Sequence, residues 1–231
     1  MSAAAGFLAK TAALAAKDLR IESRARDTLP PMLAFAIAVT LLLAFTLPIS
    51  GNLEPRYADV LAGFLWVTVL FSGLIGFART FEIERAEGAL DAVLLAPLDR
   101  SGLFFSKALA NLAAILVVEL FLLPLFGLLF GAKILSVAIV GVVLLVDVGF
   151  VAIGTLFAAL ASQTRSRELV LPILSLPALV PVFIAAVELT SDLFVGGGFG
   201  SISERGWFGL LVGFDVIFTT LGAISFDYAL D

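Results

Sequence analysis

Three acidic side chains stand near the middle of long apolar segments of this sequence: Glu119, Asp147 and Asp215. An ionised carboxylate at the centre of a membrane costs on the order of 3 kcal/mol, so such residues should face other helices or a partner. Two interpretations fit them equally well. In the first, they line a path for substrate or protons or bind a cation of a partner. In the second, they make a buried polar contact that fixes helix packing.

A second candidate site is the stretch 79–107, which holds nine of the chain's 33 charged residues. Helical periodicity over 81–96 predicts a helix with two distinct sides, and Pro97 ends it. The acidic side is formed by Glu84, Glu87 and Asp91, and the apolar side by Ala86, Leu90, Val93 and Leu94. We expect this helix to lie along a membrane surface or to dock on a partner protein. Docking on a partner would explain why so short a connection contains so regular a helix.

Several kinds of site are excluded by the residue types that the sequence lacks. It contains no cysteine and no histidine, so it cannot form a disulfide, a Cys/His zinc site, a catalytic thiol or a Ser-His-Asp triad. It also contains no G-x-x-x-x-G-K-[ST] motif, so it does not hold ATP by a P-loop. We therefore expect no catalytic, metal-binding or cofactor-binding residues and no enzymatic activity in this chain.

The composition is that of a polytopic membrane protein. The chain is 61% hydrophobic and 14% charged, against about 25% charged residues in a soluble domain. Its mean hydropathy is +1.13. We predict an all-α fold, in which residues 1–231 form one transmembrane domain. The six predicted spans are about 33–49, 58–78, 103–131, 134–161, 169–187 and 206–224.

The N-terminal segment is predicted to form an amphipathic helix over 6–27 that is retained in the mature protein. One side carries Lys10, Lys17, Arg20 and Arg24, and another carries Leu8, Ala12, Ala15 and Leu19. Such a helix is typical of a segment that lies on an anionic membrane surface.

The distribution of basic residues predicts the orientation. Eleven of the 14 Lys and Arg residues fall in the N-terminal segment and in the 79–107 and 162–168 connections, and three fall in the connections of the opposite side. Both termini and these two connections are therefore expected to be cytoplasmic. Lys107 should extend its ammonium group to the interface. Three prolines, Pro172, Pro177 and Pro181, should bend the fifth span.

The charged connection resembles that of a known family. The residues that carry the resemblance are Gly76-Phe77-x-Arg79-x-Phe81, Glu84, Glu87-Gly88-x-Leu90, Leu94-Leu95-x-Pro97, Asp99-Arg100-Ser101 and Lys107-x-x-x-Asn111. They are similar to the first cytoplasmic loop of the CcmB family, the membrane subunits of the ABC-type haem exporter of cytochrome c maturation. The run from Val118-Glu119-Leu120 to Pro124-Leu125-Phe126, the chain length and the six spans agree with this.

The resemblance implies an ABC-2-type permease-like fold in the bacterial inner membrane and several partners. A CcmA-like cytoplasmic ATPase would bind ATP and dock on the 81–96 coupling helix. CcmC-like and CcmD-like membrane proteins, a CcmE-like haem chaperone and the lipid bilayer would complete the surroundings, and no nucleic acid is expected. The implied docking residues are Arg79, Phe81, Glu84, Glu87, Gly88, Leu90, Asp91, Leu94 and Pro97.

Haem would be the cargo of the complex rather than a cofactor of this chain. Its iron usually takes His, Cys, Met or Tyr ligands, and the chain offers only Met1, Met32, Tyr57 and Tyr228. We therefore expect the iron ligands to belong to CcmC-like or CcmE-like proteins.

Other functions remain compatible with the sequence. A different ABC-2-type permease, exporting lipid, drug or polysaccharide, would share the six spans and the coupling helix. A proton-coupled carrier is supported only by the three intramembrane carboxylates. A scaffold that assembles the haem-chaperone complex without moving cargo would have the same sequence features.

Overall fold

The computed structural model describes residues 3–25, 27–47, 53–81, 100–134, 136–164, 167–197 and 206–229, and these residues are helical or connect helices. The elements are α1 (Ala3–Ala25), α2 (Leu29–Thr46), the 3₁₀ helix η1 (Pro55–Tyr57), α3 (Ala58–Arg79), α6 (Arg100–Phe130), α7 (Val137–Ser162), α8 (Arg167–Phe194) and α10 (Trp207–Ala229). Six of the helices are long and apolar enough to cross a membrane. The predicted all-α, six-span fold class is thereby confirmed.

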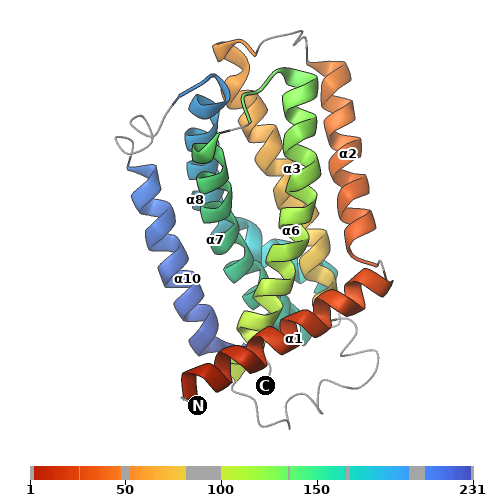
Figure 1. Cartoon of the computed structure of the whole chain (residues 1–231), viewed down its shortest axis with the longest axis vertical. Coiled ribbons are helices and arrows are strands. Elements are labelled where there is room, and N and C mark those ends of the chain that lie inside the picture. The colour runs from red at the N-terminus through yellow and green to blue at the C-terminus, as the bar shows by residue number, and fades with distance from the viewer. Residues whose placement is uncertain are drawn as a thin grey trace.

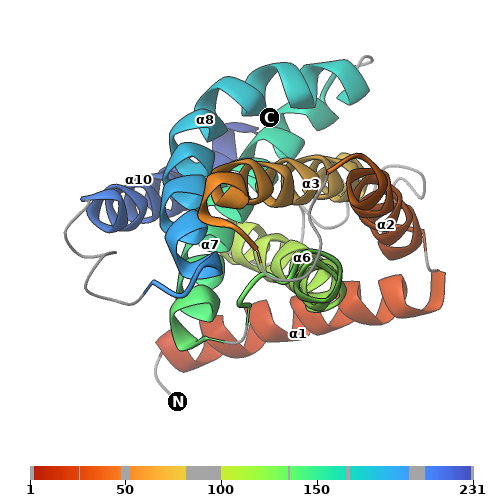
Figure 2. The same cartoon turned by 90° about the horizontal axis from the view of Figure 1, so that it is seen from above.

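The six long helices form a bundle, and α1 crosses one side of it at its base (Figures 1 and 2). Helix α7 occupies the centre, where it contacts α3, α6, α8 and α10. Helix α1 lies at the same end of the bundle as the last turns of α10 (Figure 1). Six spans, an even number, lead from the end of α1 to the end of α10, so both ends lie on the same side of the bundle.

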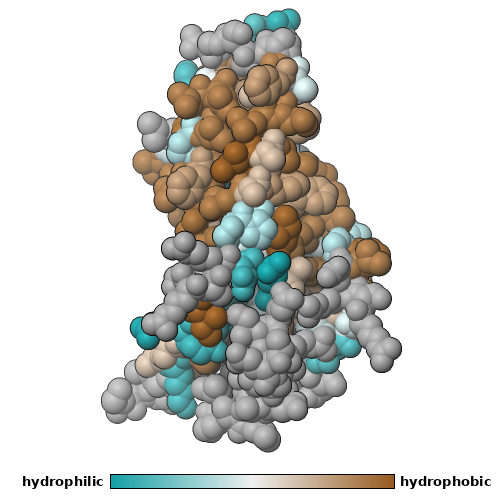
Figure 3. All heavy atoms as spheres, turned by 90° about the vertical axis from the view of Figure 1, so that its right-hand side faces the viewer, coloured by the Kyte–Doolittle hydropathy of each residue, from teal (hydrophilic) through white to brown (hydrophobic). Residues whose placement is uncertain are grey.

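The outside of the bundle is apolar. Figure 3 shows hydrophobic residues in a broad band over the upper part of one face, with hydrophilic residues gathered below it. Exposed large apolar side chains occur on all six long helices, among them Phe45, Phe71, Leu128, Val140, Ile173 and Ile224. A surface of this extent would promote aggregation in water, whereas lipid tails solvate it.

The contact between α3 and α7 depends on two glycines. A Cβ atom at Gly73 would collide with the ring of Phe150, and one at Gly154 would collide with the ring of Phe77. Each helix therefore receives an aromatic ring of the other where its own side chain is missing. The two rings also contact each other, with centroids 5.0 Å apart in an edge-to-face arrangement.

Helix α8 is longer than the sequence indicates. It ends at Phe194, seven residues beyond the predicted end of the fifth span at about 187. The reason is that burial continues beyond the apolar run. Thr190 is buried and accepts a hydrogen bond from the indole Nε1 of Trp66 at 2.9 Å. Pro172, Pro177 and Pro181 all lie inside this helix, and the helix changes direction along its length, as the sequence predicts (Figure 2).

The predicted apolar side of α1 is divided between the bundle and the surface. The basic side, with Lys10 and Lys17, is exposed, and so is Leu19 on the predicted apolar side. Ala15 of the same side and the neighbouring Thr11 are buried against the bundle. Helix α1 can therefore rest its apolar side on the membrane while its edge packs on α6.

Candidate functional site

Most of the predicted coupling helix lies outside the described residues. The residues concerned are Glu84, Glu87, Gly88, Leu90, Asp91, Leu94 and Pro97. The structure does describe the two ends to which this segment is attached, which are the last residues of α3 and the first turns of α6. These ends carry Arg79, Phe81, Lys107 and Asn111 of the family-like pattern.

Phe81 and Arg79, both predicted to dock a partner, lie in different environments. Arg79 ends α3 with its side chain exposed. Phe81 is only 3% exposed and packs on Phe226 of α10, with ring centroids 6.2 Å apart. The ammonium group of Lys107 lies 5.6 Å from the centre of the Phe81 ring. In this structure Phe81 therefore anchors the end of α3 inside the bundle, and its role in docking stays a prediction.

A chain of hydrogen bonds joins three spans directly beneath this connection. The hydroxyl of Thr80 donates to Oδ1 of Asn111 at 3.1 Å. The Nδ2 group of Asn111 in turn donates to the hydroxyl of Thr155 at 3.0 Å. Because Thr80 follows α3, Asn111 belongs to α6 and Thr155 to α7, these hydrogen bonds link the start of the connection to all three helices.

Lys107 is buried beneath α1. It is 5% exposed, and its Nζ atom lies 3.1 Å from Oδ2 of Asp18 on α1. The other carboxylate oxygen of Asp18 lies 3.2 Å from Nζ of Lys17. The ammonium group of Lys107 therefore extends to α1, which covers this part of α6 and supplies the counter-charge, rather than into solvent.

Sequence reasoning missed Asp18, although two signals pointed to it. Asp18 is one of two acidic residues, with Glu22, in an N-terminal helix whose other charged residues are basic, which favours a specific partner for it. Lys107 and Asn111 are four residues apart and therefore share one side of α6. What the sequence does not contain is the placement of α1 across that side.

Two of the three intramembrane carboxyl groups meet in the bundle. Glu119 of α6 and Asp147 of α7 are almost completely buried, and their side chains lie within hydrogen-bonding reach of each other. As carboxylates they offer each other no donor, and Oε2 of Glu119 and both oxygens of Asp147 have no donor among the described residues. A hydrogen bond between them thus requires that one of the two carries a proton.

Asp215 lies apart from this pair. It is 7% exposed, and its Oδ1 atom lies against Gly149 of α7, where a Cβ atom would collide with it. Gly149 is two residues beyond Asp147, and such residues project about 200° apart on a helix. Asp215 therefore contacts a different side of α7, and the three carboxyl groups do not form one cluster.

Comparison with known proteins identifies the family. The family described as CcmB protein matches residues 9–231, which includes all the sites described above. The chain belongs to the CcmB family. The resemblance predicted from the charged connection is thereby confirmed.

Its relatives in the CcmB family include proteins named heme exporter protein B. The chain is 31% identical to that of Rhodobacter capsulatus over 178 residues, which are 77% of this chain and 80% of the relative. It is 32% identical to that of Paracoccus denitrificans over 177 residues, or 76% and 80%. The protein of Escherichia coli K12 is 29% identical over 96 residues, or 41% of each chain.

Proposed function

We propose that this CcmB-family protein is the membrane subunit of an ABC transporter complex that delivers haem during cytochrome c maturation. The observation that carries the proposal is the family match over residues 9–231, together with relatives named heme exporter protein B. The six apolar helices supply the membrane domain that such a subunit needs.

The energy would come from a separate, CcmA-like cytoplasmic ATPase that docks on the 81–96 segment. The geometry beneath that segment supports this, because its attachment points are fixed to several spans at once. The hydrogen bonds from Thr80 through Asn111 to Thr155 connect α3, α6 and α7. Phe81 fixes the same end to α10 through Phe226. A force applied to the segment therefore reaches the centre of the bundle.

Haem is proposed as the cargo, with its iron ligands supplied by other subunits. Of the chain's four Met and Tyr residues, the structure places Met32 in the core and Tyr57 half-buried beneath the guanidinium of Arg56. Neither is placed as an open iron ligand. CcmC-like and CcmD-like membrane proteins and a CcmE-like chaperone are the proposed partners, in the inner membrane with both termini cytoplasmic.

The carboxyl pair of Glu119 and Asp147 is proposed to take part in transport rather than only in packing. Buried polar atoms in folded proteins nearly always have hydrogen-bond partners, and an unpaired one costs about 1–3 kcal/mol. Even when a shared proton joins the two side chains, at least one oxygen of Asp147 has no donor within the described part of the chain. A contact that served only to fix two helices would leave this cost unexplained.

The proposed function is tested by reversing two charges of the docking segment. We expect Glu84→Lys combined with Glu87→Lys to leave the protein in the membrane but to abolish copurification of the ATPase and maturation of c-type cytochromes. Leu90→Asp should act in the same way through lost burial. Gly88→Leu should also weaken docking if the partner approaches the backbone closely there.

A matched control reverses two acidic residues at the other end of α3. Glu54 and Asp59 are both exposed, so Glu54→Lys combined with Asp59→Lys changes the net charge equally without touching the docking segment. Copurification should then be normal. If the reversed docking segment retains the ATPase at the wild-type ratio and supports cytochrome maturation, the docking proposal is wrong. If the ATPase binds but the wild-type complex loads no haem onto the chaperone, the proposal that haem is the cargo is wrong.

A further inference from the structure

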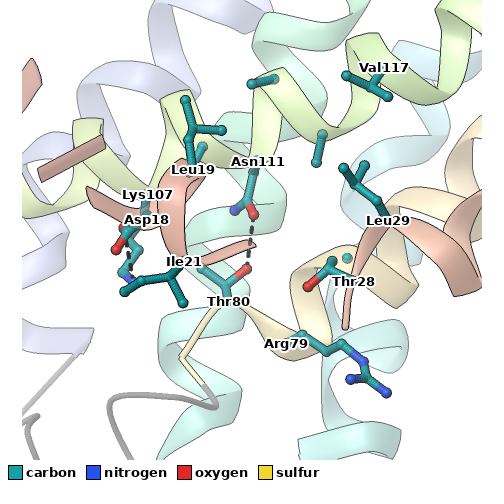
Figure 4. A pocket seen from close by; sticks show the side chains of 14 residues that line it. Asp18, Leu19, Ile21, Thr28, Leu29, Arg79, Thr80, Lys107, Asn111 and Val117 are labelled. Carbon is teal, nitrogen blue, oxygen red and sulfur yellow. Dashed lines mark hydrogen bonds and ion pairs between the residues drawn. The ribbon is translucent and has the colours of Figure 1, made fainter. Parts of the chain in front are cut away.

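A cavity that the proposed function does not use lies at the base of the bundle between α1, α2, α3 and α6. It has a volume of about 280 Å³. Figure 4 shows it from close by: the labelled side chains come from all four helices, and the exposed guanidinium of Arg79 lies at its lower edge, turned away from Asn111 and Val117. This volume is just below the usual range for ligand pockets, which is about 300–1,000 Å³, so the cavity can hold only part of a lipid.

The lining of this cavity divides into a polar part and an apolar part. Thr28, Thr80, Asn111 and the Lys107–Asp18 pair form the polar part together with Arg79. Leu19, Leu29, Ala113 and Val117 form the apolar part. In Figure 4, Leu19, Leu29 and Val117 lie above the labelled polar side chains of Thr28, Thr80 and Arg79. A ligand that fills the cavity must therefore have a polar end and an apolar end.

The polar part has a net positive charge. Three charged residues line the cavity, and two of them, Lys107 and Asp18, neutralise each other at 3.1 Å. The guanidinium of Arg79 is exposed at the end of α3 and supplies the remaining charge. Arginine presents several donors in a planar fork that matches a phosphate or carboxylate group. The polar end of the ligand is therefore expected to be an anion.

The apolar part reaches from the end of the spans into the membrane. Ala110, Ala113 and Val117 follow Lys107 along α6, and Val117 lies about 15 Å beyond Lys107 at 1.5 Å per residue. Small side chains at 110 and 113 leave the space open. Arg79 ends α3, where the charged connection begins, and Lys107 lies about two turns after the start of α6, where the connection returns. The cavity thus runs from the level of the membrane interface toward the hydrocarbon.

We propose that this cavity binds one anionic phospholipid of the membrane leaflet on which α1 lies. The phosphate of the lipid contacts the guanidinium of Arg79, and the first part of one acyl chain lies along Ala110, Ala113 and Val117. The bound lipid fills the space between α1 and the spans. A free phosphate would leave the apolar part empty, and a wholly apolar ligand would leave Arg79 unmatched.

The proposal is tested by measuring lipid retention on the full-length protein in its purified complex. The complex is equilibrated with phosphatidylglycerol or phosphatidylcholine of the same acyl chains, and retained lipid is counted by native mass spectrometry. The wild-type chain should retain one phosphatidylglycerol in preference to phosphatidylcholine. Arg79→Gln should lower this retention by about fivefold, the effect expected of one basic residue near a membrane surface. Arg79→Lys should lower it less.

Two further variants separate the proposed site from general surface charge. Ala110→Leu combined with Ala113→Leu fills the apolar part without changing any charge, and it should abolish retention of either lipid. Arg56→Gln removes an exposed arginine at the other end of α3 and should leave retention unchanged.

Four outcomes would overturn the proposal. These are no preference for the anionic lipid, equal loss in Arg56→Gln and Arg79→Gln, full retention after the cavity is filled, and displacement of the lipid by inorganic phosphate. Because the readout is lipid binding, it is independent of haem delivery, and Ala110→Leu with Ala113→Leu tests the site without changing an implied docking residue.

Discussion

Lys107 and Asp18 are a charge pair that has been taken out of water together. Such a pair gives little net stability when it is compared with apolar residues, because desolvation offsets the attraction. Removing one partner alone is different, since the other charge stays inside. At this site the lysine is 5% exposed and the aspartate belongs to a separate helix. The pair therefore fixes where α1 lies more than it stabilises the bundle.

We expect Asp18→Leu to destabilise the protein by about 3 kcal/mol, the usual cost of leaving one buried charge without its partner. Lys107→Met alone should be milder, because Asp18 is more accessible and also lies near Lys17. The double variant should recover most of the loss. Melting temperatures of the detergent-solubilised protein measure this. Lys17→Gln, which removes the exposed neighbour of Asp18, is the control. If the effects of Asp18→Leu and Lys107→Met were additive in the double variant, the pair would not be coupled.

Asp147 allows packing and function to be separated by one atom. Asp147→Asn keeps the side-chain volume. The new amide group can donate a hydrogen bond to the carboxyl oxygen of Glu119 that has no donor in the wild-type chain. We expect an unchanged or higher melting temperature, within about 1 kcal/mol. Haem delivery should fall about tenfold, which corresponds to roughly 1.4 kcal/mol at one step. Cytochrome c maturation is the readout, and the exposed Asp59→Asn is the control. Normal maturation with Asp147→Asn would leave the pair a purely structural role.

At the scale of the helices, α3 and α7 are held together by rings that fill the places of missing side chains. Phe77 lies over Gly154 and Phe150 lies over Gly73, and both phenylalanines are buried. In lipid the hydrophobic effect does not drive helices together, so close contact of this kind supplies most of the association. The interface is therefore sensitive to a single added carbon atom.

Gly154→Ala should destabilise the bundle by about 1–3 kcal/mol, the range for overpacking a filled core. The ring of Phe77 cannot retreat, because Phe150 lies against it. Gly213 of α10 has open space around its Cα atom and provides the matched control. Gly213→Ala should be neutral or stabilising by up to about 1 kcal/mol, since alanine is the better helix former. Equal melting temperatures for the two variants would mean that the ring contacts carry no energy.

The sequence predicts the helices of this protein better than it predicts their contacts. Spans such as α3 follow from runs of apolar residues, a local property, and the predicted end at 78 is one residue from the observed one. The end of α8 was missed because burial of Thr190 depends on Trp66, which is 124 residues away. The same limit applies to the carboxyl groups. Their depth in the spans is readable from sequence, but which two of them meet depends on how α6 and α7 are rotated.

At the scale of the whole molecule, charge is distributed unevenly between the two ends of the bundle. Helix α1 and the attachment points of the charged connection share the base, with Lys10, Arg79 and Lys107. Arg56 and Lys133 lie in the connections of the other end, which hold few basic residues. Positive residues near span ends are retained on the cytoplasmic side during insertion. The base should accordingly face the cytoplasm, where an ATPase could reach the connection.

This orientation predicts the outcome of cysteine labelling, for which the chain is well suited because it has no cysteine of its own. Glu54→Cys and Lys133→Cys lie at exposed positions of the upper connections and should react with a membrane-impermeant thiol reagent in spheroplasts. Lys10→Cys and Gln163→Cys are exposed at the base and should react only after the membrane is permeabilised. Equal labelling of all four after permeabilisation is the control for accessibility. Labelling of position 10 or 163 in intact spheroplasts would show that the orientation is the opposite of the predicted one. In that orientation the ATPase could not reach the 81–96 segment from the cytoplasm.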